Sequence, residues 1–132
     1  MKEVSAAVVI DNETVLLARR NPDDKLEGFW EFPGGKIEAN ETPQQCLERE
    51  IQEELGVSST AGDVFCESVF EYDHGKFKII AIYTDLHSKG FTLSSHDKAD
   101  WVPITELMNY KLMPADIPIA EKIIEQHQNR ES

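Results

Sequence analysis

The alternation of apolar and polar residues predicts a β-hairpin at the start of this chain. Residues 4–10 form an apolar run, residues 11–13 are turn formers, and residues 14–18 are again β-branched and aliphatic. Strand-like runs on either side of turn residues indicate paired antiparallel strands. We expect this hairpin to end at Arg19 and Arg20.

A second and longer hairpin is predicted further along the chain. Residues 64–72 and 76–86 are rich in β-formers, and residues 73–75 between them have turn composition. Residues 79–82 are apolar at every position, so both faces of this arm are apolar. A strand with two apolar faces is typical of the centre of a covered sheet, and we expect this arm to be a central strand.

The segment between the hairpins changes character twice. Residues 21–28 are polar and contain Pro and Gly, so they predict a loop. Residues 29–32 then predict a short aromatic strand, which Pro33 ends. Gly34 and Gly35 follow it, and glycine allows the backbone to approach a ligand closely.

The helix predicted after these glycines has capping residues at both ends. Thr42 is a suitable N-cap, Pro43 suits the first helical position, Gln45 completes a capping box, and Gly56 lies just past the end. An apolar stripe at four-residue spacing should face the core. It consists of Leu47, Ile51 and Leu55.

Three glutamates of this helix share a second face. Glu50, Glu53 and Glu54 lie roughly a quarter-turn away from the apolar stripe, so they border the core and can line a cleft. Carboxylates three and four residues apart repel by about 0.2–0.5 kcal/mol per pair. Such hard oxygen ligands on one rigid helix suit Mg²⁺ or Mn²⁺. The pattern therefore predicts a bound cation.

The C-terminal part completes the expected fold class. After a polar loop, residues 101–102 predict a brief strand, residues 103–108 a short helix, and an amphipathic helix begins near Asp116. Strands and helices in this order predict an α+β fold, with a mixed β-sheet between helices.

Length, charge and cysteine content limit the possible functions. A chain of 132 residues fits one domain over residues 1–132, and its N-terminal apolar run is too short for a signal sequence or a membrane span. Cys46 and Cys66 predict no disulfide framework, so we expect the reducing cytoplasm. The net charge of -12 argues against polymeric nucleic acid as a partner. A small anionic ligand is compatible with this charge if a metal binds with it, and no protein partner is indicated.

Residues 35–57 follow the pattern G-x5-E-x7-R-E-I-x-E-E-x-G-V. This pattern resembles the Nudix box at every defined position. The segments FWEFPGGKIE before it and LMPADIP near the C-terminus resemble the MutT branch of that family, including its CTP pyrophosphohydrolase and 8-oxo-dGTP diphosphatase members. The resemblance implies the Nudix-type α/β/α sandwich and a small nucleotide as substrate.

The resemblance also implies a set of metal ligands. Glu50, Glu53 and Glu54 would hold Mg²⁺, with Mn²⁺ possible, and the carbonyl of Gly34 would add a ligand. Arg49 would orient a glutamate. Its i, i+4 spacing to Glu53 permits this contact, although pairing with neighbours such as Glu48 or Gln45 is the alternative.

One carboxylate must act as the base that activates water, and Glu53 is our first choice beside Glu50. Many relatives place a second candidate, a glutamate, six residues before the tryptophan of a later loop. That loop reads SSHDKADW here and has Ser95 at this position. Asp97 or His96 would then be the substitutes.

Four residues in or near the box are further candidates for substrate binding. By resemblance, Arg20 would approach the nucleotide and Lys36 a phosphate, while each could equally be a solvated surface cation. Phe32 could stack on a base or belong to the core. Asp116 could accept a hydrogen bond from a base such as cytosine, or cap the last helix.

These residues favour an enzyme that hydrolyses a nucleoside triphosphate to the monophosphate and pyrophosphate with Mg²⁺. CTP, dCTP or a modified dNTP is the candidate substrate. Sanitation of oxidised purine nucleotides such as 8-oxo-dGTP is an alternative, because a protonated aspartate could donate a hydrogen bond. An alternative of another class is a nucleotide-binding regulator without turnover, which Ser95 alone favours.

Overall fold

The protein is described by a computed structural model that covers residues 1–21, 28–73 and 75–131. Most of the predicted loop at residues 21–28, and His74 of the predicted turn, lie outside the described residues. The strands are β1 (Lys2–Val8), β2 (Ile10–Asp11), β3 (Thr14–Arg20), β4 (Trp30–Glu31), β5 (Gly34–Lys36), β6 (Ser59–Tyr72), β7 (Gly75–Leu86) and β8 (His96–Pro103). The helices are α1 (Pro43–Leu55), α2 (Ile117–Glu131) and two 3₁₀ turns, η1 (Ile104–Asn109) and η2 (Pro114–Asp116).

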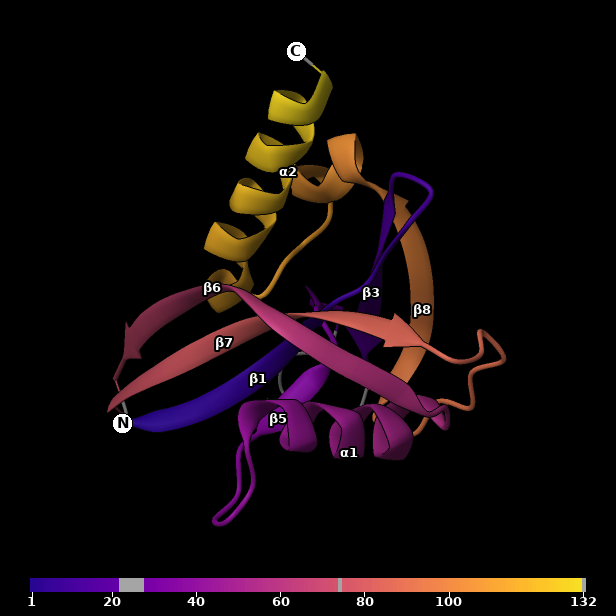
Figure 1. Ribbon diagram of the computed structural model, residues 1–132. Coiled ribbons are helices and arrows are strands. Elements are labelled where there is room, and N and C mark those ends of the chain that lie inside the picture. Colours follow the sequence, from indigo (N-terminus) through magenta and orange to yellow (C-terminus); the bar gives the residue numbers. More distant parts are fainter. Residues whose placement is uncertain (22–27, 74, 132) are drawn as a thin grey trace.

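Two four-stranded sheets form the middle layer. The first has the order β5-β1-β7-β6, and the second joins β2, β3 and β4 with β8 beside β3. The pair β1–β7 is parallel and the other pairs are antiparallel, so the strands are mixed as expected. Helix α1 lies along one side of the first sheet and α2 rises on the other (Figure 1). The α+β sandwich is confirmed.

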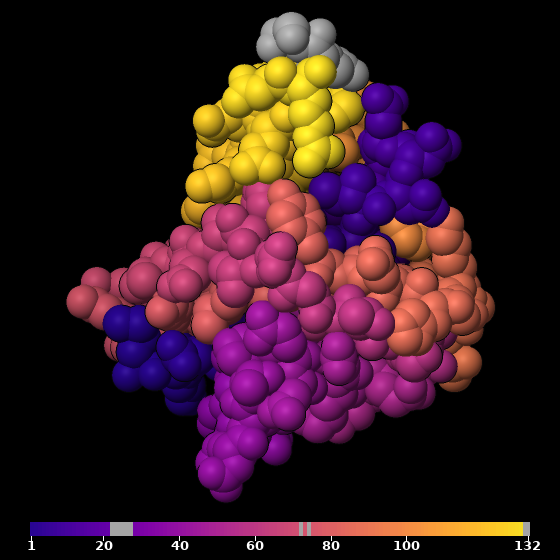
Figure 2. Space-filling view, viewed as in Figure 1, coloured from indigo at the N-terminus to yellow at the C-terminus, as the bar shows by residue number. Residues whose placement is uncertain are grey.

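Alternate strand residues supply two separate cores. In β1, Ala6 and Val8 face a core that includes residues of α2, whereas Ala7 packs with residues of α1. In β7, Ile79 and Ile80 divide between the two cores in the same way. The central position predicted for this strand is confirmed, because β7 lies between β1 and β6. In the space-filling view, α1 forms the lower part of the surface and α2 the upper part (Figure 2).

The first predicted hairpin is correct only at its turn. Residues of β2 pair with the start of β3, but β1 leaves this hairpin and pairs in parallel with β7 over seven residue pairs. Apolar side chains on both faces of β1 explain this exchange, since an interior strand buries both faces. The predicted loop before Trp101 is also wrong in part, because β8 begins at His96 and pairs with β3.

Helix α1 begins and ends where its sequence signals place it. The Thr42 side chain accepts a hydrogen bond from the Gln45 N–H, the Gln45 side chain completes the capping box, and Gly56 adopts the left-handed conformation at φ 70°. These contacts satisfy backbone groups that lack partners inside a helix. No helix of the described residues is long and apolar enough to cross a membrane. The single-domain assignment of residues 1–132 stays a prediction.

The close approach of β5 to β1 gives a stability prediction. A Cβ atom at position 34 would lie 2.0 Å from the backbone carbonyl oxygen of Ser5, which cannot move without disturbing the strand pair. We expect Gly34→Ala to lower the free energy of unfolding in urea by at least about 2 kcal/mol, in the range of overpacked cores. Gly62→Ala in β6 is the control, because a Cβ there meets its nearest atom at 3.5 Å. Equal stability of both variants would contradict this reading of the β1–β5 contact.

Candidate active site

Two glutamates of α1 pack against the backbone of residues 34 and 35. The Glu54 carboxylate accepts a hydrogen bond from the Gly34 N–H at 3.1 Å. A Cβ atom at position 35 would lie 2.3 Å from the carboxyl carbon of Glu50. Glycine at position 35 therefore leaves the space that the Glu50 carboxylate occupies. The backbone of both glycines therefore lies directly against the glutamate face of α1.

Arg49 holds the acidic groups around this contact. Its guanidinium donates to both carboxylate oxygens of Glu41, at 2.7 and 3.1 Å, to Glu50 at 2.8 Å and to Glu53 at 3.4 Å. The Arg49 hydrogen bonds are the largest cause that lowers the pKa of Glu41 to about 2. Glu41 also accepts the Glu38 N–H at 2.8 Å, so it fixes the loop before the helix. The contacts of Arg49 with Glu50 and Glu53 agree with an orienting role, and Glu48 instead accepts the Ala61 N–H.

A pocket of about 750 Å³ opens beside these groups. Its lining brings together seven of the predicted site residues, which are Arg20, Phe32, Gly34, Lys36, Glu54, His96 and Asp116. Phe70 and Phe77 form part of an apolar wall. Glu50, Glu53, Arg49 and Asp97 do not belong to the lining of this pocket among the described residues. The glutamate face of α1 and the pocket thus meet at Gly34 and Glu54.

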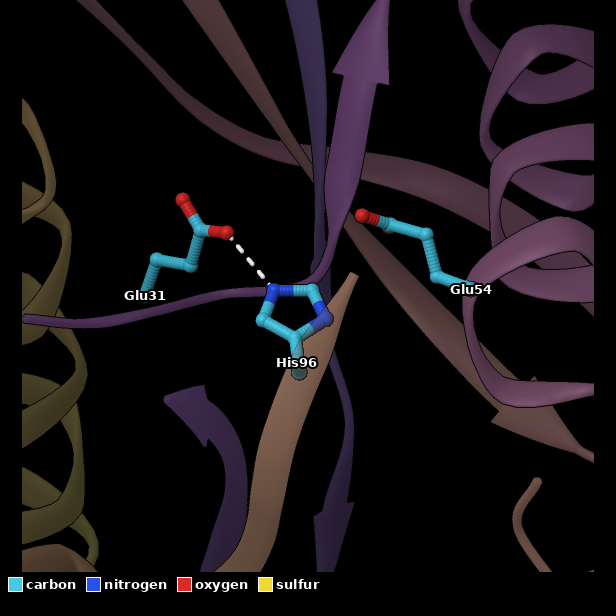
Figure 3. A group of neighbouring side chains, drawn as sticks. All are labelled: Glu31, Glu54 and His96. Carbon is cyan, nitrogen blue, oxygen red and sulfur yellow. Dashed lines mark hydrogen bonds and ion pairs between the residues drawn. The ribbon is translucent and has the colours of Figure 1, made fainter. Parts of the chain in front are cut away.

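Glu31 is a pocket residue that the sequence reasoning missed. It lies in β4 and joins two predicted residues, because one oxygen accepts from Arg20 at 2.9 Å and the other contacts His96 Nε2 at 2.7 Å. Figure 3 shows Glu31 on one side of His96 and Glu54 on the other. The available signal was an acidic residue inside the aromatic run FWEF, where burial of a charge requires a partner.

Two carboxyl groups of the pocket have strongly raised pKa values. Burial raises the pKa of Glu54 to about 8, with the nearby charge of Glu31 as the next cause. Burial and the Glu31 charge also raise the pKa of Asp116 to about 8. Both carboxyl groups are therefore largely protonated at neutral pH when no metal is bound.

Asp116 lines the pocket and is 5% exposed. Its Oδ2 accepts a hydrogen bond from the Phe32 N–H at 3.2 Å. The N-cap alternative is not supported, because no α2 N–H donates to this carboxylate among the described residues and α2 begins at Ile117. The Phe32 ring is itself 4% exposed and belongs to the core on the α2 side, although the residue also borders the pocket.

The segment that contains Ser95 separates its two candidate bases. His96 begins β8 and is buried in the pocket wall. Asp97 instead forms two hydrogen bonds with Arg19, at 2.9 and 2.8 Å, and Arg19 lowers its pKa. The pairing of β3 and β8 is irregular here, because Arg19 pairs with Lys98 and Arg20 with His96. His96 and Asp97 are adjacent in the chain but have different neighbours. Ser95 lines the pocket.

The donor set on α1 fits a hard divalent cation. Glu50 and Glu54 converge on residues 34 and 35, and Glu53 lies one helical turn from Glu50 with a side chain that is 58% exposed. Burial raises the pKa of Glu50 as well, so a cation would relieve the cost of ionising these groups together. Carboxylate and carbonyl oxygens are the ligands that Mg²⁺ and Mn²⁺ prefer.

Comparison with known proteins relates the chain to one family. Residues 1–124 match the NUDIX domain. The CTP pyrophosphohydrolase of Escherichia coli (strain K12) is 36% identical over 124 residues, 92% of this chain and 90% of that protein. The 8-oxo-dGTP diphosphatase of the same strain is 39% identical over 75 residues, 54% of this chain and 58% of that protein. The solved E. coli ORF135 protein has a TM-score of 0.88 at 34% identity, covering 98% of this chain and 93% of that one.

The buried Asp116 gives a prediction for stability against pH. Its pKa is about 8 in the folded chain against an ordinary value of 3.8, so between these pH values the folded state binds an extra proton. Stability therefore falls as the pH rises through this window. In Asp116→Asn the group cannot ionise, and we expect a shallower fall in the free energy of unfolding between pH 5 and 9, measured in urea without divalent cations. Asp85→Asn, which changes an exposed carboxylate of β7, is the control and should keep the wild-type slope. An unchanged slope in Asp116→Asn would contradict the assignment.

Proposed function

The chain belongs to the Nudix family of hydrolases, and from this membership we propose that it hydrolyses a nucleoside triphosphate to the monophosphate and pyrophosphate with a divalent metal ion. The observation that supports this most directly is the junction at Gly34. There the carboxylates of α1 meet a pocket of about 750 Å³, which is large enough for a nucleotide. Water attacks a phosphorus of the triphosphate, and one phosphoanhydride bond breaks.

Glu50, Glu53 and Glu54, with the carbonyl of Gly34, would hold Mg²⁺, or Mn²⁺ in its place. The bound cation supplies charge neutralisation at the phosphate oxygens and a lower pKa of the attacking water. Arg49 keeps the Glu50 carboxylate in position through its 2.8 Å contact. Lys36 and Arg20, which line the pocket, approach the phosphates and the nucleotide.

Glu53 is our candidate for the general base. Its side chain is the most exposed of the three, and the weak 3.4 Å contact with Arg49 leaves it able to reorient toward water. The Ser94 hydroxyl donates to the Glu53 backbone carbonyl at 3.0 Å, which ties the segment before β8 to α1. Asp97 is a poorer candidate because Arg19 occupies both of its oxygens.

The base of the nucleotide would be read by Asp116 and the adjacent Phe32 backbone. An ionised aspartate only accepts hydrogen bonds, which suits the amino group of CTP or dCTP. The raised pKa of Asp116 changes this expectation, because a protonated carboxyl also donates. This observation favours oxidised purine nucleotides such as 8-oxo-dGTP as a second candidate. Both activities occur among the names of the relatives.

The regulator without turnover is the less favoured interpretation, because Arg49, Glu50, Glu53 and Glu54 are all present and Arg49 contacts both Glu50 and Glu53. Cytoplasmic location and small nucleotides as the partners are part of the same proposal.

The first experiment is a nucleotide panel with product identification. Purified chain with Mg²⁺ should release pyrophosphate from CTP, dCTP or 8-oxo-dGTP faster than from ATP or GTP. Binding measured in parallel, with and without Mg²⁺, separates an enzyme from a regulator. Tight binding with no product from any nucleotide would overturn the proposed function.

The role of Glu53 is tested by Glu53→Gln. Loss of a positioned base should lower kcat by at least about 10²-fold. The fold should be retained because this side chain is exposed. Glu48→Gln on the same helix is the matched control. Its carboxylate accepts the Ala61 N–H, a bond that an amide oxygen can keep. Equal kcat values of Glu53→Gln and the wild type would assign the base elsewhere.

A further inference from the structure

Three side chains inside the pocket could form a cation site that uses residues outside the glutamate helix face. Glu31 comes from β4, Glu54 from α1 and His96 from β8. Each offers one ligand atom, and these atoms lie within 4.8 Å of one another. In Figure 3 the imidazole ring lies between the two carboxylates. Groups this close can belong to one metal site, as ligands of the ion or as groups that orient a ligand.

The state of His96 supplies an independent observation. The residue is 3% exposed, and its Nε2 lies 2.7 Å from a Glu31 oxygen. A carboxylate can only accept, so Nε2 carries the proton when the ring is neutral. Nδ1 is then a buried lone pair, and no hydrogen-bond donor reaches it among the described residues. Figure 3 shows this second nitrogen on the side of the ring toward Glu54.

A buried nitrogen without a hydrogen-bond partner lowers the stability of the fold unless a ligand binds to it. The charges around it specify the kind of ligand. Three carboxyl groups line the pocket, those of Glu31, Glu54 and Asp116, and Arg20 forms an ion pair with Glu31. An additional positive charge would stabilise the ionised forms of all three.

We propose that Nδ1 of His96 and the Glu54 carboxylate bind a second divalent cation, which is preferentially a first-row transition metal such as Mn²⁺ rather than Mg²⁺. Glu31 belongs to the site as the group that accepts the Nε2 proton and orients the imidazole. The preference follows from the nitrogen ligand, because imidazole suits transition metals whereas Mg²⁺ takes oxygen ligands almost alone. The site shares Glu54 with the metal set of the proposed function, but Glu31 and His96 belong to it alone. Glu31, Glu54 and His96 line the pocket, whereas Glu50 and Glu53 are not among its lining residues.

Pulsed EPR of bound Mn²⁺ tests this site without any turnover. A histidine ligand adds nitrogen modulation to the spectrum, and ligation by carboxylates and water does not. We expect the modulation in the wild type and its persistence under a large excess of Mg²⁺, which competes for the oxygen-only ligands. It should disappear in His96→Gln. His87→Gln is the control, since His87 is exposed and contacts Ser58 and Thr60.

A second variant covers the case in which His96→Gln does not fold, which circular dichroism of the metal-free chain would reveal. Glu31→Gln should weaken the nitrogen-coupled Mn²⁺ population at least about tenfold. Glu121→Gln on the exposed side of α2 makes the same charge change and should have no effect. Absence of nitrogen modulation in the wild type, or its persistence in His96→Gln, would overturn the second site. Neither result bears on nucleotide hydrolysis, which the product panel measures separately.

Discussion

The contact between helix α1 and the backbone of residues 34 and 35 is the constraint on which the site depends. Gly34 pairs with Ala6 of β1, donates its N–H to Glu54, and leaves no room for a Cβ beside Ser5. Gly35 leaves the space for the Glu50 carboxylate. One short strand therefore joins the first sheet to the acidic face of α1. Because both partners are rigid elements, the carboxylates have a fixed position relative to the pocket.

The pocket beside this contact collects carboxyl groups where little solvent reaches them. Glu54 and Asp116 both titrate near pH 8, with burial as the main cause and Glu31 as the next. A fold selected only for stability would place few such groups inside, since desolvation of a carboxylate is costly. Strongly shifted carboxyl groups in a cleft are typical of a functional site. Two arginines pair with carboxylates around this contact. Arg49 binds Glu41 and Glu50 beside the loop before α1, and Arg20 binds Glu31 in the pocket.

Predictions from the sequence were most accurate where the interaction is local. The boundaries of α1, its capping box and the left-handed Gly56 depend on residues within four positions of one another, and each is present. The central place of β7 followed from its two apolar faces. The errors concern strand partners. Pairing of β1 with β7 joins residues about 75 positions apart, and no local signal distinguishes it from the expected hairpin. The strand that begins at His96 contains polar residues at exposed positions such as Asp97 and Lys98, so its composition resembled that of a loop.

The sequence by itself determined the chemistry of the glutamate helix, because i, i+3 and i, i+4 spacing fixes which side chains share a helix face. It also identified Arg20, Phe32, Lys36, His96 and Asp116, all of which line one pocket. Only the tertiary structure decided which charges meet. Arg19 takes Asp97 away from the pocket, and Glu31 joins Arg20 to His96 across three segments. It also decided that Asp116 is buried enough to hold a proton at neutral pH. Burial and nonlocal ion pairs depend on how elements distant in the chain pack together. Local sequence patterns do not predict that packing.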